Sequence, residues 1–310
     1  LPVFTSEEGI KMIKNNLDKL FDWKNMNELI PNFYTKNKMI RTGIAGIFAA
    51  SLELTKEGVI TLSQKKLFDK IDYLIADTNL IKENEEKYYT EKIIKLSNIW
   101  STHSGFDLCR NYQEPPLLKN KYITFGSFNN FMKISNEVID TWSKILKKVN
   151  NSRLILKSSE KYNYKILMGK FEKYGVDHMV QVLDKKNFEK TEDHLNLYNK
   201  IDIALDTFPY TGVTTTFEAL WMGVPVLSLE GHNFKSRCGE SILKNANLDF
   251  LICSNKNEYI KKVYDLSNDT NRLIEIRKDI FNNILETDLF NNKKYVFQFE
   301  KIFLQKYKNI

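Results

Sequence analysis

Paired cysteines are the first feature that this 310-residue chain lacks. Its three cysteines, Cys109, Cys238 and Cys253, form no C-x-x-C pair and are odd in number. This pattern argues against a disulfide framework and against a zinc site. It favours a reducing compartment, so we expect a cytoplasmic protein.

Long apolar runs are also missing. The chain contains no stretch of 18 or more apolar residues, and the sequence therefore predicts no membrane span. The opening stretch, LPVFTSEEGIKMIKNN, lacks the basic start and long apolar run of a signal peptide. Because the first residue is Leu rather than Met, we expect a fragment or a chain without its leading residues.

Positive charge is present but not concentrated. The formal net charge is +7, yet lysine and glutamate are scattered through the whole chain and no dense basic block occurs. Scattered charge is typical of a solvated surface, so we expect no nucleic acid partner. A basic nucleic-acid-binding protein stays open as the weakest alternative.

The length and the proline pattern predict two domains. A chain of 310 residues suggests about two domains. Pro115-Pro116 can continue neither a helix nor a central strand, so we place the linker there. The predicted domains are residues 1–117 and residues 118–310. Neither contains 34-residue helical repeats or a low-complexity tract.

The first domain has an irregular pattern. SEEGIKMIKNNLDKLF predicts a helix with Ser6 as its cap. KIDYLIADT, residues 70–78, predicts a buried strand, and residues 92–100 predict another extended segment. Asp72 lies inside the first of these strands. A buried carboxylate there needs a partner or a function, and a strand-end cap is the alternative.

The second domain alternates short apolar strands with helices. Ser135 and Thr191 are the predicted caps of two of these helices. The alternation predicts right-handed βαβ units and a parallel sheet in an α/β fold. Residues 255–310 predict helices only. The predicted strands are residues 121–128, 153–159, 178–183, 201–207, 224–229 and 249–254.

The most informative motif is FPYTGVTTTFEALWMGVPVLSLEG, residues 208–231. Thr214, Thr215 and Thr216 stand at the predicted start of a helix that follows a strand. Ligands of parallel sheets bind at this edge, where helix N–H groups and the helix dipole favour a phosphate. Glu218, one turn further on, can accept hydrogen bonds from ribose hydroxyls. Capping of the helix by the threonines is an equal alternative.

Two further side chains could reach the same edge. Lys133 follows the predicted strand 121–128. A lysine there can neutralise a diphosphate leaving group, and a plain surface lysine is the alternative. His194 lies in the first turn of the predicted helix 191–200, where it either faces a ligand or packs in a half-buried position.

Three stretches together resemble a known family. FGSFNNFMKIS, LDTFPYTGVTTTFEALWMGVPVLSLEG and IDYLIADTNLIKENEEKYYTEKIIKLSNIW are similar to the SPINDLY / O-GlcNAc transferase family, glycosyltransferase family 41, in its bacterial-type catalytic region. The resemblance runs from about residue 67 to the end. It implies a GT-B-like α/β fold. Residues 118–310 would form a Rossmann-like nucleotide-sugar domain, and residues 1–117 an incomplete acceptor-side domain of the same kind.

The resemblance also implies an activity. Members of the family transfer a sugar from a nucleotide sugar to Ser or Thr hydroxyls of proteins, with inversion and without a metal. The donor is UDP-GlcNAc in many members, which we expect here, and GDP-fucose in some. The chain contains no D-x-D motif, in agreement with metal independence. The implied partners are a nucleotide sugar and an acceptor protein, and no cofactor is implied.

The resemblance assigns roles to the residues that could hold the diphosphate. Lys133 matches a lysine that stabilises the diphosphate, and Asn130 matches a position beside the phosphates. Thr214 and Thr215 match two threonines that hold the diphosphate, and Thr216 adds the third hydroxyl of this turn. These five residues are the predicted diphosphate site.

Three more residues complete the predicted site. By the same resemblance, His194 matches a histidine of the nucleotide pocket, and Glu218 matches an acidic residue that binds ribose. Asp72 matches an aspartate that handles protons or structures the active site. The resemblance therefore assigns catalysis to Lys133 and Asp72, and no metal ligand.

The sequence departs from the family on the acceptor side. GVITLSQKKLF stands where W-L-G-Y-P-G-T-T-G is usual, and the family's first strand, active-site histidine and helical repeats have no counterpart. Val213 replaces a histidine, and Thr191 replaces a lysine although Lys190 is adjacent. Two interpretations stay open. The chain is either an active glycosyltransferase, or a non-catalytic nucleotide-sugar-binding relative or fragment of a longer transferase.

Overall fold

The structure is a computed structural model of the whole chain. Its contacts divide the chain into two units, Leu1–Lys70 and Ile71–Ile310. The domain boundary between residues 117 and 118 stays a prediction, and the contacts group residues 71–117 with the C-terminal part. The described residues are 5–15, 29–31, 47, 50–51, 73–106, 108–157, 164–184, 188 and 190–307.

The first unit is described mainly at helix α1 (Ser6–Asn15). The backbone N–H of Glu8 donates to Thr5 Oγ1 at 3.2 Å, and the N–H of Thr5 donates to Glu8 Oε2 at 2.8 Å. This reciprocal pair of bonds is a capping box. The predicted helix is confirmed over Ser6–Asn15, with Thr5 rather than Ser6 at the cap, and residues 16–21 of that prediction lie outside the described residues.

The centre of the second unit is a six-stranded parallel sheet in the order β5-β4-β3-β6-β7-β8. The first strand, β3, lies in the middle of the sheet. Strands β4 and β5 extend the sheet to one edge, and β6, β7 and β8 then form the other half. This is a doubly wound sheet, and its topological switch point lies between β3 and β6. The strands are β3 (Ile123–Ser127), β4 (Ser152–Lys157), β5 (Val180–Leu183), β6 (Ile203–Leu205), β7 (Val226–Leu229) and β8 (Ile252–Cys253).

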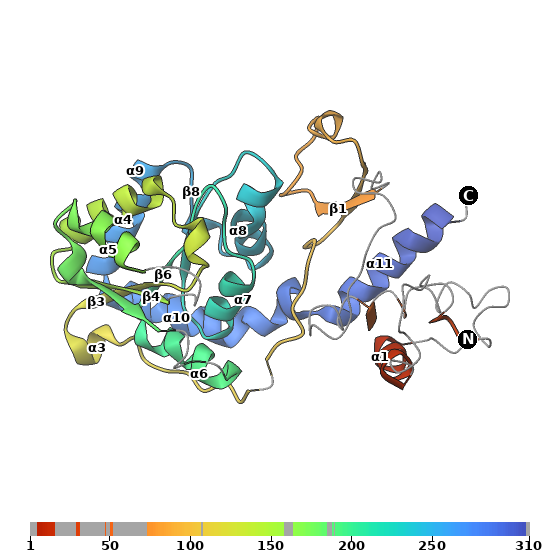
Figure 1. Cartoon of the computed structure of the whole chain (residues 1–310), viewed down its shortest axis with the longest axis horizontal. Helices are drawn as coiled ribbons and strands as arrows, with labels where there is room; N and C mark the ends of the chain where they lie inside the picture. The colour runs from red at the N-terminus through yellow and green to blue at the C-terminus, as the bar shows by residue number, and fades with distance from the viewer. Residues whose placement is uncertain are drawn as a thin grey trace. The chain divides into compact units, whose positions relative to one another are not determined.

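Helices cover both faces of this sheet, with α4, α5 and α9 on one side and α6, α7 and α10 on the other (Figure 1). The α-helices of this unit are α3 (Leu117–Asn120), α4 (Asn136–Lys148), α5 (Tyr164–Glu172), α6 (Thr191–Asn196), α7 (Thr214–Trp221), α8 (Phe234–Asn245), α9 (Lys256–Asn268), α10 (Thr270–Asn283) and α11 (Asn292–Tyr307). The 3₁₀ helices are η5 (Glu86–Tyr88), η6 (Phe131–Lys133), η7 (Asp177–Met179), η9 (Leu197–Lys200), η10 (Asp249–Leu251), η11 (Ile284–Glu286) and η12 (Asp288–Phe290).

The core follows the apolar periodicity of the sequence. Val138, Trp142, Ile145 and Leu146 lie on one face of α4, and each is at most 1% exposed. They belong to one buried cluster with strand residues such as Phe125. Burying a large apolar side chain contributes about 1.5–3 kcal/mol, so this layer is a main source of stability for the domain.

The two predicted helix caps have different outcomes. Ser135 Oγ accepts a hydrogen bond from the backbone N–H of Val138 at 3.2 Å, which confirms the predicted cap of α4. The cap predicted at Thr191 is wrong, because α6 begins at Thr191 and Lys190 occupies the cap position. Lys190 has no side-chain oxygen that could accept from the helix N–H groups.

A smaller parallel pair precedes the large sheet. Strands β1 (Tyr73–Asp77) and β2 (Lys92–Leu96) lie in the two segments predicted to be extended. Segment 78–91 connects them. The side chain of Asp77, at the end of β1, accepts hydrogen bonds from the backbone N–H groups of Asn79 and Leu80 and so shapes the start of this segment.

Candidate functional site

Two loops meet at the switch point of the large sheet. The loop after β3 contains residues 128–135, and the loop after β6 contains residues 206–213. Their strands are neighbours, with Phe125 opposite Ile203. Because the crossovers from these strands pass to opposite faces, a crevice is expected at their carboxyl ends. We refer to residues 206–213 as the donor loop.

Asp206 anchors the donor loop from within the protein. Its Oδ1 accepts from the backbone N–H groups of Gly212 at 2.7 Å and Thr207 at 2.8 Å, and from Asn129 Nδ2 at 3.3 Å. Its Oδ2 accepts from Ser228 Oγ at 2.7 Å. Burial raises the pKa of Asp206 to about 6, against the opposite effect of these hydrogen bonds. The loop is therefore closed around one carboxylate.

Gly212 lets the donor loop approach the start of α7 closely. A Cβ at this position would lie 2.5 Å from Thr215 Oγ1, 2.9 Å from Thr216 Oγ1 and 3.1 Å from Asn129 Oδ1. A side chain at this position would therefore force these hydroxyls to move, and glycine avoids the clash. The loop, the first turn of α7 and Asn129 form one closely packed group.

The three predicted threonines occupy different environments in the first turn of α7. Thr214 is exposed, Thr215 is half-buried and Thr216 is buried. Thr215 Oγ1 lies 2.9 Å from Asn129 Oδ1 and donates to it. The cap residue Val213 has no polar side-chain atom, so the N–H groups of the first turn are not capped by the preceding side chain. The helix therefore presents backbone donors and one exposed hydroxyl.

Lys133 lies against the donor loop. Its Nζ donates to the carbonyl of Thr211 at 2.8 Å and is 4.1 Å from the centre of the Tyr210 ring. Burial lowers the pKa of Lys133, and the nearby charge of Asp206 acts in the opposite direction. An ammonium group has three donors, so these contacts leave it able to bind an anion as well.

Glu218 and His194 are in direct contact. Glu218 Oε2 is 2.9 Å from His194 Nε2 and accepts from the hydroxyl of Tyr198 at 2.8 Å. His194 Nδ1 is 2.8 Å from Lys157 Nζ. Because a lysine ammonium only donates, Nδ1 acts as the acceptor and Nε2 carries the proton toward Glu218. The carboxylate is thus held by two donors beside the first turn of α7.

The structure brings most of the predicted residues to one edge of the sheet. Lys133 and Thr214–Thr216 lie around the donor loop, and His194 and Glu218 lie beside them. Asn130 is exposed there, and its Oδ1 accepts from the backbone N–H of Met132 at 3.0 Å, which caps η6. Asp72 lies outside the described residues. The binding roles of all these residues stay predictions.

Four residues of this site are not among those predicted: Asn129, Lys157, Tyr198 and Asp206. Asp206 carried a usable signal, because it directly follows a strand at the edge where ligands bind. Asn129 shares the predicted loop with Asn130, and the sequence does not show which of the two side chains turns inward. Lys157 ends β4, while Tyr198 belongs to η9, and each becomes a neighbour of the site only through folding.

Two further findings concern the described residues alone. In that part of the chain, no helix is both long and apolar enough to cross a membrane. The same residues contain no group of three or more His, Cys, Asp or Glu side chains placed to hold a metal ion.

The chain resembles a family of known glycosyltransferases. A family profile described as glycosyl transferase family 41 matches residues 106–299, which is more than half of the chain. A protein of Solanum lycopersicum named probable UDP-N-acetylglucosamine--peptide N-acetylglucosaminyltransferase SPINDLY is 31% identical over 241 residues, covering 75% of this chain and 25% of that protein. The Oryza sativa subsp. japonica protein of the same name is 34% identical over 215 residues, covering 68% of this chain and 23% of that protein.

A solved structure extends the likeness to the fold. A mutant of the Thermobaculum terrenum O-GlcNAc transferase superimposes with a TM-score of 0.68 at 30% identity, covering 77% of this chain and 45% of that one. The predicted α/β class with a GT-B-like architecture is thus confirmed. The chain spans about a quarter of the length of the curated relatives it matches. It belongs to glycosyltransferase family 41.

Proposed function

We propose that this chain carries the donor site of a glycosyltransferase that moves GlcNAc from UDP-GlcNAc to Ser or Thr hydroxyls of proteins. The observation that carries the proposal is the position of the Lys133 ammonium beside the donor loop and the uncapped first turn of α7. The names of the curated relatives, which specify UDP-N-acetylglucosamine and a peptide, support this donor and acceptor. We propose a cytoplasmic location, as the dispersed cysteines favour.

The proposed reaction inverts the anomeric carbon and uses no metal. The acceptor oxygen attacks that carbon from the face opposite the diphosphate, its proton passes to a base, and the electron pair of the breaking bond goes to the diphosphate oxygen. Charge therefore develops on the leaving UDP. In this proposal Lys133 and the N–H groups at the start of α7 stabilise that charge, which is the part a metal ion plays elsewhere.

In our proposal the three threonines of α7 have different roles in binding the diphosphate. Thr214 is exposed and can donate its hydroxyl to a phosphate oxygen. The hydroxyl proton of Thr215 is directed to Asn129, so Thr215 contributes its backbone N–H instead. Thr216 is buried and supports the turn from behind. Asn130 stays a candidate for the phosphates and Asp72 for proton handling.

Glu218 and His194 form the proposed ribose end of the site. Tyr198 and His194 both contact Oε2 of Glu218, which fixes the orientation of the carboxylate. A carboxylate has about four lone-pair positions, so it can accept from ribose hydroxyls in addition to these two donors. Proper orientation before binding is what makes such a contact effective.

A second function is supported by the departures of the sequence on the acceptor side. GVITLSQKKLF stands where W-L-G-Y-P-G-T-T-G is usual in the family, so this chain would bind a nucleotide sugar without completing the transfer by itself. This is the non-catalytic relative or fragment left open by the sequence. GDP-fucose is the alternative donor under either function.

Calorimetric titration with UDP, GDP, UDP-GlcNAc and GDP-fucose in the presence of EDTA tests the proposal. We expect saturable binding of UDP and UDP-GlcNAc without metal, followed by transfer to Ser/Thr peptides. Preference for the guanine nucleotides would overturn the choice of donor. Binding without either transfer or donor hydrolysis would favour the second function, and no binding at all would reject the donor site.

A further inference from the structure

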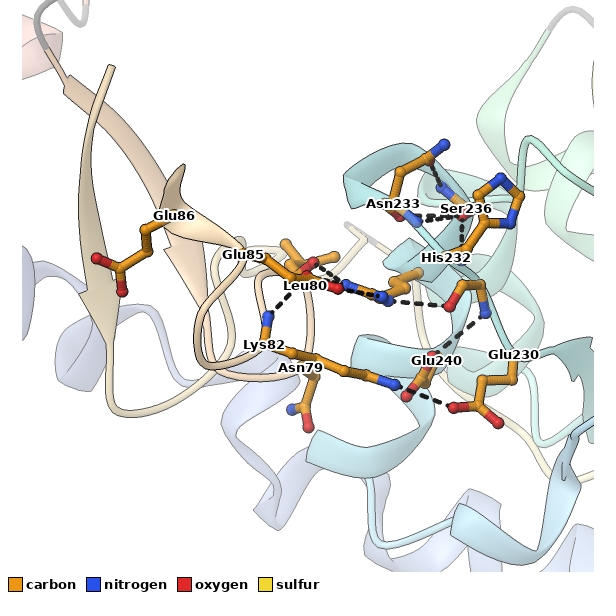
Figure 2. A network of polar contacts seen from close by, with 12 residues as sticks. Asn79, Leu80, Lys82, Glu85, Glu86, Glu230, His232, Asn233, Ser236 and Glu240 are labelled. Carbon is orange, nitrogen blue, oxygen red and sulfur yellow. Dashed lines mark hydrogen bonds and ion pairs between the residues drawn. The ribbon is translucent and has the colours of Figure 1, made fainter. Parts of the chain in front are cut away.

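A buried arginine joins two segments that are far apart in the sequence. Arg237 of α8 is 4% exposed, and its guanidinium donates to both carboxylate oxygens of Glu85, at 2.5 and 2.8 Å. It also donates to the carbonyl of Leu80 at 3.1 Å and, through Nε, to the carbonyl of Gly231 at 2.9 Å. Figure 2 shows this network, which ties segment 78–91 to α8 and to the loop after β7.

The geometry of the Glu85–Arg237 pair makes it a strong contact. A bidentate arginine–carboxylate pair fixes orientation as well as charge. The hydrogen bonds from Arg237 lower the pKa of Glu85 to about 2, so both groups are charged at neutral pH. Glu85 is half-buried, but Arg237 is buried, so removing Glu85 leaves the guanidinium without this partner in a buried place, which is costly. Segment 78–91 is therefore firmly attached to α8.

The same helix contacts the donor loop. The backbone N–H of Gly239 donates to Thr211 Oγ1 at 3.0 Å, and this hydroxyl donates to the carbonyl of Lys235 at 3.3 Å. The carbonyl of Thr211 is the group that accepts from Lys133. A Cβ on Gly239 would lie 2.6 Å from Asp206 Oδ2, so the helix has no room to move closer. A displacement of α8 would therefore displace Thr211.

Apolar contacts extend this connection to α7. Leu80 and Ile81, from segment 78–91, form a buried cluster with Cys238 of α8. Val213, the residue before the first turn of α7, packs against the same cluster. The segment therefore supports both the helix behind the donor loop and the residue at the mouth of α7.

We propose that the Glu85–Arg237 pair is a positioning element of the donor site. It holds α8 against the donor loop, and through Thr211 it keeps the Lys133 ammonium where the diphosphate binds. Arg237 acts through these contacts and does not touch the nucleotide. The inference rests on the proposed function, since it assigns a role within the same donor site.

The test compares Glu85→Gln and Arg237→Lys with a matched control, Lys82→Ala. Lys82 Nζ lies 3.0 Å from Glu230, so this ion pair joins the same segment to the same loop. Both of its side chains are 42% exposed, and pairs of that kind contribute little. We expect UDP affinity, measured by calorimetry, to fall about tenfold in the first two variants and to stay unchanged in the control.

Thermal unfolding of each variant distinguishes a role in positioning the donor site from a role in overall stability alone. A structural role alone would lower the unfolding temperature and leave the UDP affinity of the folded protein unchanged, which would overturn the proposal. In a Lys133→Ala background, Glu85→Gln should have a smaller effect on UDP affinity. The reason is that the pair acts on the nucleotide through α8, Thr211 and Lys133. Full additivity of the two changes would also contradict it.

Nucleotide titration of the unmodified chain distinguishes a failure of this inference from a failure of the proposed function. If it binds none of the four nucleotides, the donor site and its positioning element are both rejected. If it binds UDP and both variants bind UDP equally well, only the positioning element is rejected.

Discussion

Two carboxylates anchor neighbouring segments of this protein in opposite ways. Asp206, in the donor loop, is 2% exposed and accepts from neutral donors only, two backbone N–H groups and the side chains of Asn129 and Ser228. Burial raises its pKa to about 6. Glu85, in segment 78–91, is paired with a guanidinium that lowers its pKa to about 2. One segment is held by neutral hydrogen bonds and the other by an ion pair.

The difference between the two pKa values predicts how each segment responds to pH. The donor loop depends on a carboxylate whose raised pKa lets it take up a proton in mildly acidic solution, so its charge state changes there. Segment 78–91 keeps its ion pair to a much lower pH. The Glu85–Arg237 pair therefore keeps its charges over a wider pH range than the carboxylate of the donor loop.

The largest expected effect comes from removing Lys133, the cation beside the donor loop. Lys133→Ala should lower turnover by about 10²–10³-fold, because the Nζ held at the carbonyl of Thr211 is the charge that we propose for the leaving diphosphate. Steady-state transfer measured at saturating UDP-GlcNAc checks this. Lys144→Ala is the matched control, since Lys144 is an exposed lysine paired with Asp140 on α4. Equal turnover in the two variants would remove Lys133 from the mechanism.

Asp206→Asn should have the next largest effect. The amide keeps the shape of the side chain but turns one acceptor into a donor, so a buried N–H or hydroxyl loses its partner. We expect the free energy of unfolding to fall by about 1–3 kcal/mol and UDP-GlcNAc affinity to fall with it. Ser228→Ala removes a single one of these bonds and should cost about 1 kcal/mol. Denaturant unfolding measures both, and an unaltered Asp206→Asn protein would contradict the anchoring role.

Asp206→Asn also tests how the contributions of Asp206 and Glu85 to stability depend on pH. The raised pKa of Asp206 means that the folded state binds more protons than the unfolded state between about pH 4 and pH 6, so stability falls as pH rises through this window. Glu85 has the opposite sign, since its contribution is present above about pH 4.5 and is lost as the pH falls toward 2.

The difference in unfolding free energy between the wild type and Asp206→Asn should therefore slope between about pH 4 and pH 6. Taking the difference cancels Asp202, whose pKa is also raised by burial, to about 6. The corresponding difference for Glu85→Gln should slope only at lower pH. A flat difference for Asp206→Asn would show that this carboxylate does not titrate in that window.

Glu218→Gln should weaken nucleotide binding more mildly. The amide can still accept one hydrogen bond from ribose, but it weakens the contacts that His194 and Tyr198 make with Oε2. We expect a loss of UDP affinity of severalfold, on the order of 1 kcal/mol. 2′-Deoxy-UDP and 3′-deoxy-UDP serve as controls. If Glu218 binds ribose, the variant should no longer distinguish UDP from at least one of them, and full discrimination would count against the assignment.

The sequence predicts the large sheet well because its strands are short apolar runs between helices with regular apolar faces. Phe125 and Trp142 are buried as the pattern requires. Position at the end of a strand also suffices to bring Lys133 and Thr214 to one edge. Local pattern alone cannot predict the contact of Glu218 with His194, because 24 residues separate them and only the folding of the chain brings them together.

Capping and turn details were harder to predict for a related reason. Thr5 and Ser6 can both cap a helix, and Thr191 also has a suitable hydroxyl although Lys190 occupies the cap position. The residue at that position depends on backbone angles that the sequence does not specify. The sequence pattern does not single out Asp206, because this residue follows a strand whose apolar residues dominate the pattern, although its four hydrogen bonds organise the loop.

Substitutions of the two neighbouring asparagines should have the smallest effects on UDP binding. They also test a position where the match to the family and the structure point to different residues. Asn130 matches the family position beside the phosphates, yet its exposed side chain caps η6, whereas Asn129 is 5% exposed and contacts both Thr215 and Asp206. Asn129→Ala should weaken UDP binding severalfold, because it removes the partner of the Thr215 hydroxyl. Asn130→Ala should change UDP binding little and cost about 0.5–2 kcal/mol of stability as a lost cap. A larger loss of affinity in Asn130→Ala would mean that this loop turns over when the diphosphate binds, and that the family match describes the bound form.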